Sequence, residues 1–91
     1  MNLEHIREQI NSIDSQLVDL LEQRMELVDQ VTAYKRATSK PVLDTNRENA
    51  VLERVGNLVQ KEDYRSAIQA TFSDMMAQSR AYQSSKLANH E

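Results

Sequence analysis

The chain has 91 residues and a net charge of −3, with one glycine, one proline, no cysteine and 4% aromatic residues. So few turn-forming and aromatic residues exclude β sandwiches and barrels, and the lack of cysteine excludes disulfide frameworks and thiolate metal sites. The acidic balance disfavours a nucleic-acid partner. No apolar run approaches the ~20 residues that span a bilayer, and the initial MNLEHIREQ lacks the basic and apolar parts of a secretion signal. We therefore expect a single all-α domain over residues 1–91, in the cytoplasm and without membrane contact.

A long helix is predicted from about residue 3 to 38. Apolar residues recur at alternating spacings of three and four from Leu3 to Tyr34, which is the heptad pattern of a coiled coil. Pro41 pushes Lys40 out of helical geometry and ends the helix. Such a helix is about 54 Å long, whereas a compact chain of this size has a radius of gyration of only about 12 Å. Its apolar seam must therefore meet another copy or another protein, and self-association is the more economical interpretation.

Arg24 interrupts this seam at a heptad a position. It is either a register-setting or outward-snorkelling residue, or a guanidinium held for an anionic ligand, because an unpaired buried charge is too costly to persist. Lys35 follows eleven residues later, close to three full turns, so both point the same way and favour the ligand. Arg7 lies roughly 25 Å from Arg24 along the axis. An antiparallel second chain could bring its Arg7 beside the first chain's Arg24.

A second helix is predicted at about 45–60, after a connecting loop. Asp44 or Thr45 caps its start, and Thr45 followed three residues later by Glu48 fits a capping box. A glutamate in the first turn also complements the helix dipole, which gives Glu48 an ordinary structural explanation. Arg47 in the same turn is less favourable and indicates another reason for its presence.

A third helix is predicted at about 64–85, followed by a polar tail that we expect to fray. Ser79 and Gln83 lie one turn apart and continue the apolar stripe of this helix. Polar groups in such a place are either the solvated end of the helix or donors that face a pocket. Taken alone, the residues favour the solvated end.

The side chains available for chemistry are mainly cations on or beside apolar faces. The sequence has no glycine-rich phosphate loop, no Ser-His-Asp order and no metal-ligand spacing among its carboxylates. A cationic set suits a small polyanion, and an enzyme built from it would work by positioning and electrostatic stabilisation in a dry site. The set comprises Arg7, Arg24, Lys35, Arg47, Glu48, Ser79 and Gln83.

In their order along the chain, these residues resemble the signature of the all-helical chorismate mutase family. Each segment alone is weak, but the ordered set with these spacings is highly specific and covers Leu3 to Gln83. The matching segments are IREQI with Arg7, then Asp14, LLEQRMEL with Arg24, Lys35, KPVLDTNRE with Asp44, Arg47 and Glu48, and finally Ser79 and Gln83.

The resemblance implies three helices per chain, one long and two shorter, with two chains intertwined along the long helix as a homodimer. It implies the rearrangement of chorismate, a small dicarboxylate, to prephenate in phenylalanine and tyrosine biosynthesis. No metal, cofactor or covalent intermediate would take part. Each of two equivalent sites would use Arg7 from the partner chain.

The resemblance also assigns a role to each residue of the site. Arg24 and the partner's Arg7 would pair with the two substrate carboxylates through planar guanidinium groups. Lys35 and Gln83 would donate to the ether oxygen, which gathers negative charge in the transition state. Glu48 and the backbone at Asp44 would bind the substrate hydroxyl, and Ser79 would contact a carboxylate or its surroundings. Arg47 would shape the wall of the site and support Glu48 or a carboxylate.

Two alternatives stay open from the sequence. An isochorismate pyruvate lyase on the same fold needs a similar cationic pocket, although the full residue set favours the mutase. A non-catalytic helical dimerisation module would explain the heptad pattern. That module leaves Arg24 on the seam, in line with Lys35, without an explanation.

Overall fold

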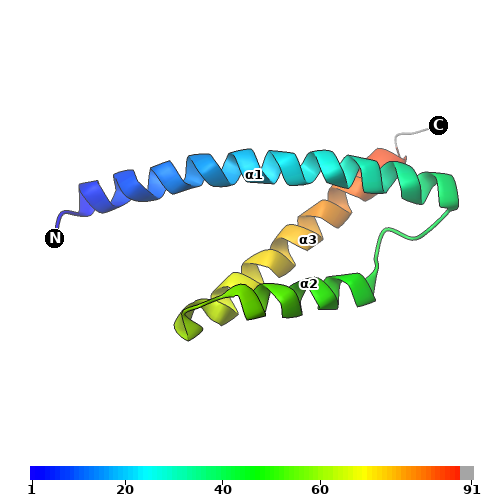
Figure 1. Cartoon of the computed structure of the whole chain (residues 1–91). Coiled ribbons are helices and arrows are strands. Elements are labelled where there is room, and N and C mark those ends of the chain that lie inside the picture. The colour runs from blue at the N-terminus through cyan, green and yellow to red at the C-terminus, as the bar shows by residue number, and fades with distance from the viewer. Residues whose placement is uncertain (89–91) are drawn as a thin grey trace.

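Three α-helices and one short 3₁₀ turn make up the computed structural model, which describes residues 1–88 (Figure 1). No strand occurs among these residues, so the all-helical class with three helices, one long and two shorter, is confirmed. The elements are α1 (Leu3–Thr38), α2 (Thr45–Leu58), η1 (Glu62–Tyr64) and α3 (Arg65–Ala88). Within this part of the chain, none of the helices combines the length and the apolar character that crossing a membrane requires.

Local backbone chemistry bounds α1 at both ends. The side-chain oxygen of Asn2 accepts hydrogen bonds from backbone N–H groups of the first turn, which caps the helix. At the other end Ser39 adopts the left-handed conformation with a φ of 56°, and the Lys40 N–H donates to the carbonyl of Lys35. Pro41 follows directly and cannot continue a helix, so the chain turns away toward α2.

Two helix ends differ from the ranges that the residue pattern predicts. α2 ends at Leu58 rather than near residue 60, because Val59 already takes an extended conformation with φ −68° and ψ 124°. α3 continues to Ala88 instead of ending near residue 85, so the first residues of the polar tail are helical. No glycine or proline follows Gln83, and polar composition alone does not stop a helix. Residues 89–91, the remainder of the tail expected to fray, lie outside the described residues.

The hydrophobic core is small and lies between α2 and α3. α3 also crosses the C-terminal half of α1, whereas α2 makes no close backbone contact with α1 (Figure 1). At this crossing the Tyr82 hydroxyl donates to Oδ1 of Asp29 at 2.6 Å, and the carboxylate raises the pKa of Tyr82 above its usual value. The buried core residues are Val51, Val55 and Met76, with Leu52, Ile68 and Phe72 packed against them.

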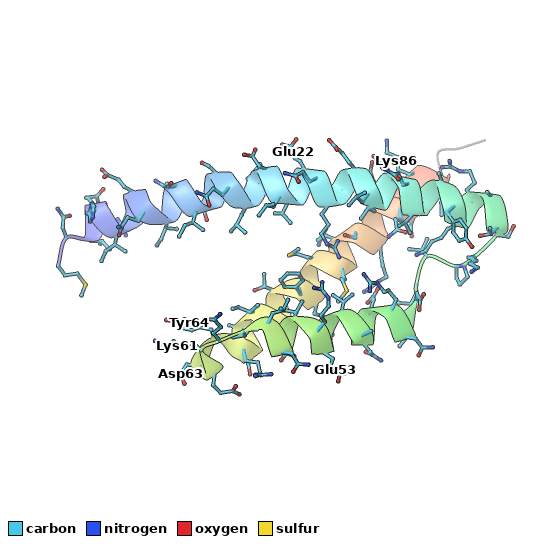
Figure 2. The ribbon with its side chains drawn as sticks, in the orientation of Figure 1. Glu22, Glu53, Lys61, Asp63, Tyr64 and Lys86 are labelled. Atoms are coloured by element: carbon cyan, nitrogen blue, oxygen red, sulfur yellow. The ribbon has the colours of Figure 1, made fainter. Side chains whose placement is uncertain are left out.

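The apolar seam of α1 stays uncovered in the single chain. Thr32 is the one residue of α1 that is buried among the described residues. Ile13, Leu20 and Leu27 on the seam keep 55%, 59% and 60% of their surface exposed. Glu22 lies on the opposite side of α1, facing away from α2 and α3 (Figure 2). The long helix is thus amphipathic, and its apolar side has too little of its own chain to pack against.

Gly56 marks a close approach between α2 and α3. A Cβ at this position would lie 2.3 Å from Nε2 of Gln69, and the Gln69 amide donates to the carbonyl of Leu52 at 3.0 Å. The missing side chain therefore leaves room for a hydrogen bond between the two helices. The glycine costs α2 roughly 1 kcal/mol of helix propensity relative to alanine.

We predict that Gly56→Ala is close to neutral in the wild-type chain. The gain in helix propensity, roughly 1 kcal/mol, is offset by displacement of the Gln69 amide, whose hydrogen bond contributes a similar amount. In a Gln69→Ala background the same substitution raises the free energy of unfolding by about 1 kcal/mol. Urea unfolding of the four proteins at one protein concentration measures both effects. Equal changes in the free energy of unfolding in the two backgrounds would show that contact with Gln69 does not offset the effect of Gly56→Ala.

Candidate active site

A cavity of about 230 Å³ opens where the C-terminal half of α1, the loop after it, the start of α2 and the end of α3 meet. Valine and leucine side chains supply much of its wall, and charged and polar groups supply the rest. Seven of the eight site residues predicted from the sequence line it, which are Arg24, Lys35, Asp44, Arg47, Glu48, Ser79 and Gln83. The structure therefore brings together groups that are spread over three helices.

Arg24 points into the chain rather than outward to solvent. Its Nη1 donates to the hydroxyl of Ser79 at 3.2 Å, and the arginine is half-buried. Ser79 and Gln83 are 7% and 6% exposed. The interpretation that the residues alone favour, a solvated helix end, is therefore wrong, because the crossing of α1 covers this face of α3. Helical periodicity places two residues on one face but does not show what covers that face.

Lys35 is held by two neutral acceptors. Its Nζ donates to the carbonyl of Val42 at 2.6 Å and to Oε1 of Gln83 at 3.3 Å. An ammonium group has three protons, so one stays available to a ligand. Because Gln83 receives Lys35 on its oxygen, its NH₂ group also stays available as a donor. The two residues thus offer two donors from neighbouring positions in one cavity.

The start of α2 differs from the predicted capping box. Asp44 is the N-cap, and its Oδ1 accepts the backbone N–H of Arg47 at 3.0 Å. Thr45 is already the first helical residue, so the Thr45–Glu48 box is wrong by one position. Glu48 is therefore free of capping and forms an ion pair with Arg80 of α3. Arg47 lines the cavity and is exposed.

Arg80 is a cavity residue that the sequence interpretation missed. It lies four residues after Met76 and three before Gln83, so it shares a helix face with both. That spacing could have indicated that Arg80 lies on the face of α3 that lines the cavity. Its partner Glu48 lies 32 residues away on another helix, and no local pattern indicates such a pairing.

Arg7 lies apart from the other seven predicted residues. It belongs to the second turn of α1, its side chain is 62% exposed, and its Nη1 is 3.4 Å from Oε1 of Glu4. Along the helix axis it is roughly 25 Å from Arg24. A single chain therefore forms a cavity without this arginine.

The charge balance of the cavity favours an anionic ligand. Four cationic side chains and two carboxylates line it, which leaves an excess of two positive charges. Arg24 and Lys35 are bonded to a hydroxyl, a carbonyl and an amide, none of which neutralises a charge. Within residues 1–88 no three His, Cys, Asp or Glu side chains form a group that could hold a metal ion.

The sequence matches the chorismate mutase type II family over residues 6–84. The bifunctional chorismate mutase/prephenate dehydratase of Buchnera aphidicola subsp. Schizaphis graminum (strain Sg) is 37% identical over 57 residues, which cover 63% of this chain and 15% of that protein. The protein of the same name from Enterobacter agglomerans is 38% identical over 50 residues, which cover 55% of this chain and 13% of that protein. The chain thus aligns with only a small part of these curated relatives. No solved structure matches it.

Proposed function

Because the chain belongs to the chorismate mutase type II family, we propose that its cavity rearranges chorismate to prephenate in phenylalanine and tyrosine biosynthesis. The observation that carries the proposal is the pairing of Lys35 with Gln83 in a cavity that has two excess positive charges. Chorismate is a dicarboxylate, so its two negative charges match that excess. The reaction is intramolecular and exchanges a C–O bond for a C–C bond, so it needs no proton from the protein.

Lys35 and Gln83 supply the electrostatic part of catalysis. As the ether C–O bond breaks, negative charge gathers on the ether oxygen, and donors aimed at that oxygen bind the transition state better than the substrate. The free Nζ proton of Lys35 and the NH₂ group of Gln83 are such donors. The Val42 carbonyl orients the ammonium group beforehand, so little reorganisation is needed during the reaction.

Arg24 binds one substrate carboxylate and helps to select the compact conformer that reacts. The Ser79 hydroxyl accepts from one nitrogen of the guanidinium and fixes its direction, while other N–H groups remain for the ligand. Glu48 accepts a hydrogen bond from the substrate hydroxyl, which the backbone at Asp44 also binds. Arg47 forms the outer wall. Holding both ends of the substrate in this way brings the two carbon atoms that form the new bond close together.

A homodimer completes the site. Two antiparallel copies of α1 cover each other's exposed seam, and each buried aliphatic side chain contributes roughly 1.5–3 kcal/mol to the association. The same arrangement places the partner's Arg7 near Arg24 and gives the second substrate carboxylate its own guanidinium. The exposed seam and the distance of Arg7 from its own cavity support this assembly.

The test of the function is turnover of chorismate by the purified protein. The ultraviolet absorbance of chorismate should fall. Chromatography followed by mass spectrometry should find prephenate as a new, separate species with the same mass as chorismate. Lys35→Ala should lower kcat roughly 10²–10³-fold, because it removes one transition-state donor. If micromolar protein consumes no chorismate, the mutase function is contradicted and the non-catalytic dimerisation module is favoured. Release of pyruvate from isochorismate without prephenate formation would indicate the lyase instead.

The pH dependence tests the role of Gln83. An amide has no proton to lose, so wild-type kcat should stay nearly constant between pH 6 and 8. Gln83→Glu donates only as a carboxylic acid, and a glutamate has an ordinary pKa of about 4.3, so the kcat of this variant should rise toward low pH. A steep fall of wild-type kcat over the same range would contradict the role.

Complementation tests the shared site. Arg7→Ala and Lys35→Ala proteins should each be nearly inactive, but a mixed dimer would contain one site with both defects and one with neither. Random subunit exchange in an equal mixture should restore about one quarter of the wild-type activity. Lys35→Ala mixed with Gln83→Leu is the control, because both residues come from one chain and no intact site forms. If exchange occurs and the first mixture stays inactive, Arg7 does not act across the interface.

A further inference from the structure

The ion pair between Glu48 and Arg80 differs from the other ion pairs in the described part of the chain. Arg7–Glu4 and Arg65–Glu62 join residues one turn apart. The Glu48–Arg80 pair joins α2 to α3, both partners line the cavity, and the Glu48 side chain is only 22% exposed. An ion pair between separate elements fixes two side chains that neither helix would hold alone.

The position of this pair creates an electrostatic requirement. A carboxylate inside a cavity for a dianion repels the ligand, and the repulsion is strong where water is excluded. Arg80 cancels the charge of Glu48 without removing its acceptor oxygens. One oxygen, Oε1, accepts the guanidinium N–H, which leaves Oε2 for a hydroxyl proton of the ligand.

We propose that Arg80 is a positioning residue that neutralises Glu48 and aims its free oxygen at the substrate hydroxyl. The inference rests on the proposed function, since it assigns the hydroxyl-bearing part of chorismate to this pair. Arg80 differs in this respect from Arg24 and Lys35, whose neutral partners leave their charges to the substrate. Loss of Arg80 should therefore weaken substrate binding more than it slows the chemical step.

The experiment is a double-mutant cycle with Arg80→Met, Glu48→Gln and the double variant, measured as KM and kcat for chorismate. Arg80→Met leaves an uncompensated carboxylate in the cavity and should raise KM roughly tenfold or more, with a smaller effect on kcat. The double variant should have a lower KM than Arg80→Met alone, because an amide needs no counterion. A KM in the double variant that equals or exceeds that of Arg80→Met would overturn the proposal.

Arg65→Met is the matched control. Arg65 lies on the same helix, its side chain has the same 34% exposure as that of Arg80, and it forms an ion pair outside the cavity. Its removal should leave KM unchanged. An equal rise of KM in both variants would show that Arg80 acts only through general charge or stability, and would overturn the proposal.

Arg80→Lys covers the case in which Arg80→Met does not fold. Lysine keeps the charge, so this variant should fold and retain a KM close to the wild-type value. A rise of KM of tenfold or more would overturn the role of charge compensation.

The activity of the wild-type protein distinguishes failure of the proposed function from failure of the proposed role of Arg80. If it does not consume chorismate, the proposed function fails. If it is active and Glu48→Gln does not rescue Arg80→Met, only the role of Arg80 fails.

Discussion

The length of α1 is the constraint on which the rest of the structure depends. The helix has 36 residues, and the chain extends 55 Å along its longest axis, but α3 reaches only the C-terminal half of α1. The remaining seam is apolar and exposed in the single chain, and the proposed homodimer would bury it. The same length separates Arg7 from the cavity of its own chain. The length of α1 thus supports both parts of the proposal, a dimer and a site shared between two chains.

Neutral hydrogen-bond partners explain how the cavity keeps its charge. Burying a cation next to a carboxylate would neutralise it, and burying it without any partner would be too costly. Arg24 and Lys35 avoid both outcomes, because a hydroxyl, a carbonyl and an amide satisfy some of their N–H groups. Their positive charge stays available to an anionic ligand. Arg80 has a carboxylate partner instead, so Glu48 neutralises its charge.

Much of the fold could be predicted from local patterns, whereas most of the site was predicted from the resemblance to a known family. The heptad spacing and Pro41 indicate the long helix, and the eleven-residue interval places Arg24 and Lys35 on one face. The cap of α2 was uncertain because Asp44 and Thr45 are neighbours and both types cap helices. The burial of Ser79 and the pairing of Arg80 depend on contacts between helices. Periodicity along one helix carries no information about such contacts.

The central claim is that a complete site needs two chains, and a crystal structure of the protein with a stable dicarboxylate mimic of the transition state tests it most directly. We predict two chains packed along α1, with Arg24 and Lys35 of one protomer and the partner's Arg7 all within hydrogen-bonding distance of the same ligand. A ligand bound by one chain alone, with Arg7 of both protomers directed away from it, would contradict the account.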